Sequence, residues 1–187
     1  MIGYTQSALY SNKASMGNQA GILIGGMMNI PLFDCFEVQP EIAYLTKGGE
    51  DISPSLTIPG FTDISAYYSK HYVQMPIIAR GRIPVGQSLA FTGLLGLYGA
   101  FIVGSDDFLE MRSYNDDGTI KEHRLVNQTF DTDSFDTGVI TGIGMDLMIG
   151  TRTIQSELRI ATGFRNVYRV IGPFGNRTVS ITAGYLF

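Results

Sequence analysis

Hydrophobic and polar residues alternate along most of the chain, so that apolar residues recur at every second position. In the segment IQSELRIATGF, for example, Leu158 and Ile160 fall on one face, whereas Glu157 and Arg159 fall on the other. A period of two is typical of β-strands with one apolar face. No long stretch repeats its apolar residues every 3.6 positions, as an amphipathic helix would. The pattern therefore predicts an all-β protein.

The alternation predicts eight antiparallel strands in an up-and-down arrangement. They are expected at residues 1–9, 19–30, 36–47, 67–83, 88–103, 135–150, 153–166 and 176–187. Short connections alternate with long ones, and the long ones cover approximately residues 10–18, 48–66, 104–134 and 167–175. This asymmetry is typical of transmembrane β-barrels of the outer membrane, which have short periplasmic turns and long extracellular loops. We expect one domain over residues 1–187, with both termini on the periplasmic side.

Composition narrows the class of protein further. Charged residues make up 16% of the chain and glycine contributes 23 of its 187 residues, whereas soluble domains contain about 25% charged residues. The uncharged stretch 83–105 is long enough for a membrane helix, but it contains a proline and five glycines between strand-like flanks. The net charge of −4 argues against a general nucleic-acid binder. These features favour a membrane β-barrel.

The ionic side chains fall on the strand faces opposite to the aliphatic ones. In a soluble lipocalin-like carrier the apolar face would point inward, but the lumen of eight strands is barely wide enough for side chains. With the apolar face in lipid, acids and bases can pair inside, and they must, because an unpaired buried charge costs several kcal/mol. We therefore expect a polar network in the lumen. Its predicted members are Glu37, Glu41, Gln74, Arg80, Arg82, Asp146, Glu157 and Arg159.

Aromatic residues mark the two edges of the expected apolar band. Phe91 and Phe101 lie ten positions apart on one face. At about 3.3 Å per residue and a tilt of about 40°, this spacing corresponds to a height of about 25 Å, which is that of the band between aromatic girdles. The predicted aromatic girdle consists of Phe36, Tyr44, Phe91, Phe101, Phe164, Tyr185 and Phe187.

Several segments are similar to motifs of a known family. FEVQPEIAYLTKGG, YVQMPIIARGRI, GLLGLYGAF, FDTGVITGIGMDL and ITAGYLF resemble strands of the PorT-like family of Gram-negative outer-membrane β-barrels, which has OmpA/OmpX-like architecture. The resemblance covers roughly residues 19–187 and implies the fold and the outer-membrane location. The family's glutamate in the second motif is Gln74 here. The final Phe187 resembles the C-terminal aromatic signal that the barrel-assembly machinery reads.

Few residues suggest catalysis or metal binding. Ser69 and His71 share a strand face near the outer rim and could form the nucleophile–base pair of a lipid-modifying enzyme, although the sequence shows no acid beside them. Two histidines exclude a His-rich metal site, and the single Cys35 excludes an internal disulfide. A segment around Gly118 resembles an EF-hand start, yet Arg124 stands where a bidentate glutamate is required. We expect no catalytic residue, no metal site and no cofactor.

The expected function is non-enzymatic: an envelope scaffold, an interaction surface at the extracellular loops, or a secretion accessory. The loop 104–134, with eight acidic and three basic residues, suggests weak divalent-cation binding as a hypothesis. A lipid-modifying enzyme and a soluble carrier of an apolar ligand are the alternatives. Expected partners are outer-membrane lipid, lipopolysaccharide, the barrel-assembly machinery and a protein at the loops, and we expect a monomer. The first residues show no signal-peptide pattern, so an exported form would be processed or recombinant.

Overall fold

The computed structural model describes residues 1–10, 17–51, 61, 63–115, 117–127, 133–164 and 175–187. These residues form eleven strands, and they contain no helix that is long and apolar enough to cross a membrane. The strands are β1 (Ile2–Tyr10), β2 (Gly17–Met27), β3 (Ile30–Phe33), β4 (Phe36–Asp51), β5 (Asp63–Val85), β6 (Leu89–Ser105), β7 (Phe108–Tyr114), β8 (Ile120–Asn127), β9 (Phe135–Ile149), β10 (Arg152–Gly163) and β11 (Gly175–Leu186).

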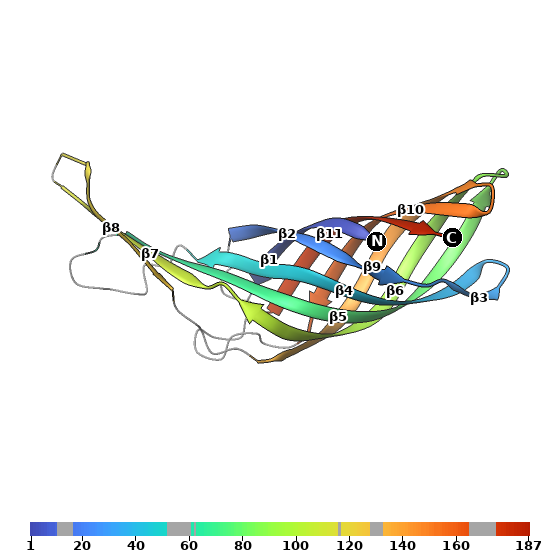
Figure 1. Cartoon of the computed structure of the whole chain (residues 1–187), viewed down its shortest axis with the longest axis horizontal. Coiled ribbons are helices and arrows are strands. Elements are labelled where there is room, and N and C mark those ends of the chain that lie inside the picture. The colour runs from blue at the N-terminus through green and yellow to red at the C-terminus, as the bar shows by residue number, and fades with distance from the viewer. Residues whose placement is uncertain (11–16, 52–60, 62, 116, 128–132, 165–174) are drawn as a thin grey trace.

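Eight of these strands close into a barrel (Figure 1). Each of β1, β2, β4, β5, β6, β9, β10 and β11 pairs antiparallel with the next, and β11 returns to pair with β1. The seam between the first and last strands runs from the pair Ile2–Ala183 to the pair Tyr10–Gly175. The predicted eight-stranded antiparallel barrel is confirmed. The stretch 83–105 forms the end of β5, a turn and β6, so the helical interpretation of this stretch is wrong.

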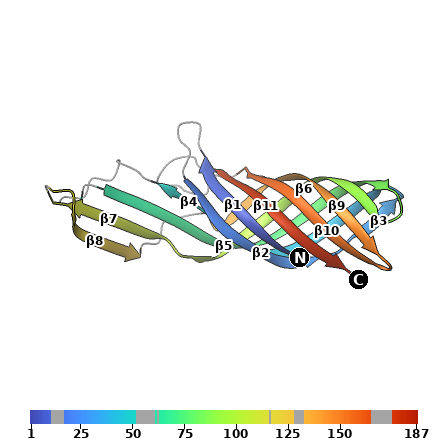
Figure 2. The ribbon, with the colours of Figure 1, turned by 90° about the horizontal axis from the view of Figure 1, so that it is seen from above.

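The tight turns gather at one end of the barrel. Ile149 and Arg152 pair directly, so Gly150 and Thr151 form a two-residue loop. Gly150 has a φ of +64°, which fits the first central position of a type II′ turn. Gly86 in the turn between β5 and β6 also has a positive φ, of +75°. Figure 2 shows these turns at the end opposite to β7 and β8.

The structure differs from the sequence prediction in the segment 104–134. This segment was expected to be a loop, but it contains the hairpin of β7 and β8, and β7 pairs with β5 from Asp63–Arg112 to Tyr67–Phe108. The sheet of β5, β7 and β8 therefore projects beyond the barrel (Figure 1). The prediction missed these strands because charged residues on both faces of β8 hide the alternation.

A smaller difference concerns the connection between β2 and β4. The predicted strand 19–30 is interrupted at Met28 and Asn29, and the short strand β3 then pairs with the start of β4. The other barrel strands begin and end within a few residues of their predicted limits. β4 and β5 are longer than expected because their pairing continues to Asp51–Ala66. Residues 165 and 166 of a predicted strand lie outside the described residues.

The outer surface of the barrel is aliphatic, whereas its interior is ionic. Ile181 is 62% exposed, but Arg159 on the neighbouring strand is only 3% exposed. Phe101 and Val179 also point outward. A soluble carrier would have the opposite arrangement, so the carrier alternative is wrong. A barrel with this outer surface would be insoluble in water, whereas the surface is suited to contact with the hydrocarbon of a membrane.

Inside the barrel, an apolar layer separates two polar regions. Its leucine and isoleucine side chains come from five strands: Leu23, Leu45, Ile78, Leu94 and Ile140. Glycines make room for bulky neighbours in this narrow space. A Cβ atom on Gly138 would lie 2.6 Å from the ring of Tyr98 and 2.1 Å from the carbonyl oxygen of Thr162. The ring of Tyr98 can therefore lie against the wall only because residue 138 is glycine.

The lipid-facing band can be tested with matched arginine substitutions. Leu97 lies in the middle of β6 and is 64% exposed, and Leu125 on β8 is 60% exposed. We expect Leu97→Arg to lower the free energy of unfolding in bilayers by about 2–4 kcal/mol, because the midplane is costly for a charge. Leu125→Arg should leave it within about 0.5 kcal/mol. Equal effects in reversible urea unfolding would contradict a membrane band at Leu97.

Candidate functional site

The end of the lumen nearest the tight turns is filled by an ionic network centred on Arg80. This guanidinium from β5 is fully buried. Its Nη1 atom donates to Glu37 Oε2 at 2.8 Å and its Nη2 atom to Asp146 Oδ1 at 2.7 Å. Its Nε atom lies 3.4 Å from Glu157 Oε1. One cation thus connects β4, β9 and β10, which are not all neighbours in the wall.

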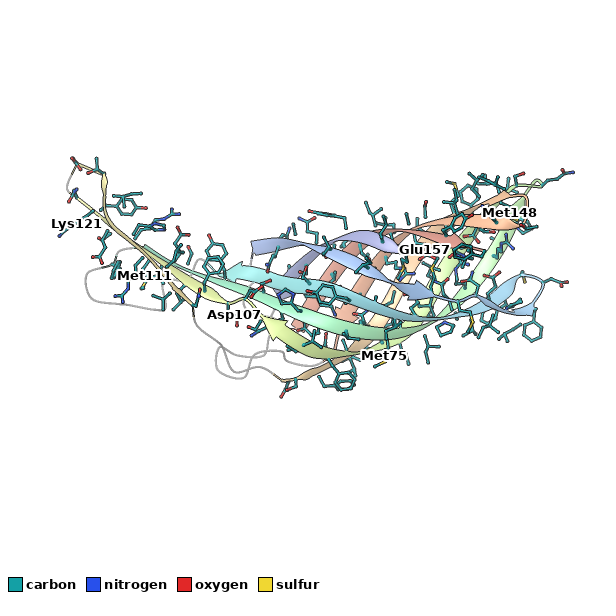
Figure 3. The ribbon with its side chains drawn as sticks, in the orientation of Figure 1. Met75, Asp107, Met111, Lys121, Met148 and Glu157 are labelled. Carbon is teal, nitrogen blue, oxygen red and sulfur yellow. The ribbon has the colours of Figure 1, made fainter. Side chains whose placement is uncertain are left out.

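Arg159 on β10 extends this network. Its two terminal nitrogens donate to Glu41 at 2.8 and 2.6 Å, in a bidentate pair, while its Nε atom donates to Glu157 Oε2 at 2.7 Å. Glu157 (labelled in Figure 3) is therefore shared by Arg80 and Arg159. Bidentate arginine–carboxylate pairs are strong and geometrically specific. The network stabilises the circumference of the barrel from within.

The remaining predicted lumen residues lie at the margins of this network. Arg82 is partly exposed at the mouth, with its Nε atom 3.4 Å from Asp146 Oδ2. Gln74 also points into the lumen and is buried, but its Oε1 atom has no hydrogen-bond partner among the described residues. The structure thus brings seven of the eight predicted residues into ion pairs and places Gln74 apart from them.

A second polar cluster, which the sequence analysis missed, lies on the other side of the apolar layer. Lys47 Nζ is 3.4 Å from Asp136 Oδ2 and lies 4.9 and 4.5 Å from the ring centroids of Tyr72 and Tyr98. Tyr98 and Asn176 donate hydrogen bonds to the same Asp136 oxygen. The ammonium thus combines an ion pair with cation–π contacts. The alternation that places Glu37 and Glu41 inside also places Lys47 inside, so the signal was present in the sequence.

A further buried ion pair, separate from these two clusters, lies where the barrel wall passes into the projecting sheet. Lys70 Nζ donates to Asp107 Oδ2 at 2.5 Å and to Ser105 Oγ at 2.8 Å. Asp107 (labelled in Figure 3) also accepts from the backbone amide of Ser69 at 3.1 Å. Lys70 and Asp107 are both buried. They fix the short connection between β6 and β7 to the edge of β5.

His71 is engaged on both sides of its ring. Its Nε2 atom lies 2.8 Å from Asp106 Oδ2, and its Nδ1 atom is hydrogen-bonded to the hydroxyl of Tyr44. An acid beside His71 was not visible in the sequence because Asp106 comes from another segment of the chain. Both ring nitrogens are therefore engaged by Tyr44 and Asp106, and among the described residues no hydrogen bond joins the imidazole to Ser69.

All predicted girdle residues lie on the outer surface, and Tyr44 is partly covered by His71. Phe101 packs against Phe135 with ring centroids 4.7 Å apart. Tyr185 and Phe187 pack edge-to-face at 4.9 Å. The exposed members are Phe36, Phe91, Phe101, Phe164, Tyr185 and Phe187. Such rings are typical of the interfaces between lipid and water.

Glu110 is paired with other side chains of the projecting hairpin. Glu110 accepts from Arg112 Nε at 3.0 Å and lies 2.8 Å from His123 Nε2. The hydrogen bond from Arg112, with a smaller contribution from His123, holds the pKa of Glu110 below its ordinary value. In the described part of the chain no three acidic, histidine or cysteine residues form a group that could hold a metal ion. Asp116 and Asp131 of the acidic loop lie outside the described residues.

The Arg80 network can be tested by removing its centre. Arg80→Met should lower the free energy of unfolding by about 3–5 kcal/mol, because it leaves buried carboxylates without their cation. The matched control is Arg152→Met, which removes an exposed arginine near Tyr185 and should cost at most about 1 kcal/mol. The readout is the heat-resistant folded band on a gel, together with urea unfolding. Unchanged heat resistance in Arg80→Met would contradict a stabilising role.

Comparison with known proteins places the chain in a family. The family described as outer membrane protein beta-barrel domain matches residues 2–169. No curated protein matches the chain. Similar solved structures include Ail, the attachment invasion locus protein of Yersinia pestis, with 14% identity, a TM-score of 0.43, and coverage of 100% of this chain and 95% of Ail. Ail in complex with the heparin analogue sucrose octasulfate gives 17% identity, a TM-score of 0.42 and the same coverage.

The N-terminal β-barrel domain of Pseudomonas aeruginosa OprF has 11% identity and a TM-score of 0.39, and 99% of this chain and 96% of that domain are covered. The family match extends over most of the chain and agrees with the closed barrel, its aliphatic outside and its ionic lumen. The chain belongs to the family of outer membrane protein beta-barrel domains.

Proposed function

We propose that this outer-membrane barrel is not an enzyme and that it presents its projecting β-sheet to a protein partner outside the cell. The observation that carries this proposal is the position of β8. Among the described strands β8 pairs only with β7 and ends the sheet, so one of its edges offers backbone N–H and C=O groups. Such an edge can accept an extended segment of another protein as an added strand.

The projecting sheet is ordered before any partner binds. Ile64, Leu109 and Met111 are buried on one of its faces, and Tyr67 stacks on Phe108 with ring centroids 4.5 Å apart. A preorganised edge loses little conformational entropy on binding, which favours affinity. A PorT-like accessory role in secretion would use the same surface, and it is supported by the sequence motifs of residues 19–187.

The barrel itself serves in this proposal as a scaffold and not as a pore. Two ionic clusters and the apolar layer of Leu45, Ile78 and Leu94 occupy the lumen in succession. The outer band contacts lipid and lipopolysaccharide, and the terminal strand that ends at Phe187 is read by the barrel-assembly machinery. The closed wall pairs all eight barrel strands, which supports a monomer.

The edge of β8 can be tested with a photo-crosslinking amino acid placed at Leu125 on whole cells. We expect a protein adduct from Leu125, because it lies on the exposed strand, and only lipid adducts from the matched position Leu97 in the membrane band. A barrel in which residues 108–127 are replaced by a short Gly-Ser linker should fold, as its heat-resistant band will show, but should lose partner binding. Absence of a protein adduct at Leu125 would refute the proposed surface.

The absence of catalysis can be tested at the outer rim. Ser69→Ala and His71→Ala should each leave the mass spectrum of lipid A and phospholipids from the cells unchanged, because the imidazole is occupied by Tyr44 and Asp106. The comparison strain should lack the protein altogether. A modified lipid that is present with the unaltered chain and lost in both variants would identify an enzyme and overturn this part of the proposal.

A further inference from the structure

The alternation of hydrogen bonds along β7 shows which of its residues face β8. The amide of Asp106, just before β7, donates to the carbonyl of Ser69 on β5 at 2.8 Å. At the other end of β7, the amide of Asn115 donates to the carbonyl of Thr119 at 2.8 Å, across the turn that leads into β8. Because successive residues of an antiparallel strand bond to alternate sides, both bonds assign the even-numbered residues of β7 to β5 and the odd-numbered ones to β8.

The register then shows which residues of β8 face its free edge. Met111 and Ser113 of β7 pair with Arg124 and Glu122 of β8. The backbone groups of these two β8 residues therefore point to β7. The pairing is regular over residues 122–127 and shifts register only beside Tyr114. In this regular part, the residues whose N–H and C=O groups point to the free edge are His123, Leu125 and Asn127.

Glu122 and Arg124 carry opposite charges on one face of β8. They lie two positions apart, and both side chains are exposed. In the described part of the hairpin, ion pairs join Glu110 to Arg112 and His123, and none involves Glu122 or Arg124. An added antiparallel strand with a base opposite Glu122 and an acid opposite Arg124 would therefore pair both charges. Read in the reverse direction, β8 itself has this order of charges.

We propose that the partner of β8 is β8 of a second copy of this chain, an inference that rests on the function proposed for this edge. The two strands run antiparallel about a two-fold axis at His123. Glu122 of each copy then lies opposite Arg124 of the other, which gives two ion pairs. These are non-hydrogen-bonded positions, where opposite side chains lie closest. The two His123 residues form the hydrogen-bonded pair at the axis.

Backbone geometry and charge together select this register. Edge-facing residues must pair with edge-facing residues, so the axis must pass through a residue and not between two residues. An axis at Glu122 would place the two Glu122 carboxylates opposite each other, and an axis at Arg124 would do the same with the two guanidinium groups. Like charges directly opposite are destabilising. Of these three neighbouring axes, only the axis at His123 places acid opposite base.

The same register covers apolar side chains that the projecting sheet leaves exposed. Leu125 is 60% exposed and Ile120 is 57% exposed. In the proposed pair, Leu125 lies opposite Lys121 of the other copy, whose aliphatic stem can cover it. Ile120 lies opposite Val126. Burial of these side chains adds a hydrophobic contribution to the two ion pairs.

Antiparallel pairing also fixes the relative direction of the two barrels. In Figure 3, Lys121 lies at the end of the sheet farthest from the barrel, whereas Asp107 lies close to the barrel. The far end of each hairpin therefore lies beside the near end of the other, and the two barrels stand at opposite ends of one continuous sheet. Two chains in one membrane point in the same direction and cannot pair in this way. The proposed contact thus joins two opposed outer membranes, and each chain is a monomer in its own membrane.

The first test places the full chain in two populations of phosphatidylcholine vesicles that carry a donor and an acceptor fluorophore. We expect energy transfer from clustering of the two populations, because many weak contacts between two membranes act together. Glu122→Arg on both populations, or Arg124→Glu on both, should lower the clustering rate about tenfold or more, because each change places like charges opposite each other twice. The heat-resistant band shows that each variant is folded. Absence of clustering with the unaltered chain would overturn the proposal.

Mixed populations test the register itself. Glu122→Arg on one population and Arg124→Glu on the other should restore clustering, because every charge then meets an opposite charge. The matched control is Lys121→Glu, which changes the net charge as Arg124→Glu does but lies opposite Leu125, and it should leave the rate within about twofold. If the mixed populations fail to cluster, or if Lys121→Glu abolishes clustering as Arg124→Glu does, the proposed pairing is wrong.

A disulfide tests the axis and the crossing between membranes, in a Cys35→Ser background. Two His123→Cys chains would have Cα atoms about 5.5 Å apart, which suits a disulfide. Leu125→Cys is the matched control, because the two copies of residue 125 would lie four positions out of register. With a tag on the chains of one population, we expect a disulfide between tagged and untagged chains for His123→Cys. A disulfide that forms only within one population would contradict the proposal.

The photo-crosslink at Leu125 separates failure of this inference from failure of the proposed function. A cell-surface adduct with the mass of two chains supports both. An adduct with a different protein, together with vesicles that do not cluster, overturns the second copy as the partner and leaves the edge of β8 as an interaction surface. Absence of both a protein adduct and clustering refutes both proposals.

Discussion

Ion pairing inside the lumen is the interaction on which the rest of this structure depends. Hydrocarbon on the outside forces the charged side chains of the wall to point inward, where eight strands leave little room and little water. Each such charge therefore needs a partner on another strand. Arg80 meets acids from three strands, and Arg159 shares Glu157 with it. The strands can be aliphatic on the outside because these charges are paired within.

Closure of the barrel wall provides hydrogen-bond partners for the backbone, as ion pairing does for the charged side chains. A strand edge in lipid would leave N–H and C=O groups without partners, and pairing of β1 with β11 removes that edge along most of the seam. The free edge of β8 lies beyond the barrel, where water can satisfy its backbone groups.

The projecting sheet is an extension of the barrel and not a separate unit. β5 has 23 residues and pairs with β6 in the barrel and with β7 beyond it. The change of partner occurs at Asp106 and Asp107, whose side chains diverge. Asp107 pairs with Lys70 inside, and Asp106 bonds to His71 outside. At the point where β5 changes its partner, the projecting sheet is therefore held by one contact inside the wall and by another outside it.

The sequence by itself determined the strands of the barrel and the direction of their side chains. A period of two assigns each residue to a face, and the absence of charges from one face shows that this face meets lipid. It could also have placed Lys47 in the lumen, since that residue continues the alternation of Glu37 and Glu41. Only the tertiary structure decided which acid meets which base, because Glu41 and Arg159 are 118 positions apart and face each other across the lumen. The tertiary structure also decided the conformation of the segment 104–134. Its charged strands form because they pair with the end of β5, and not because their own alternation of polar and apolar residues predicts a strand.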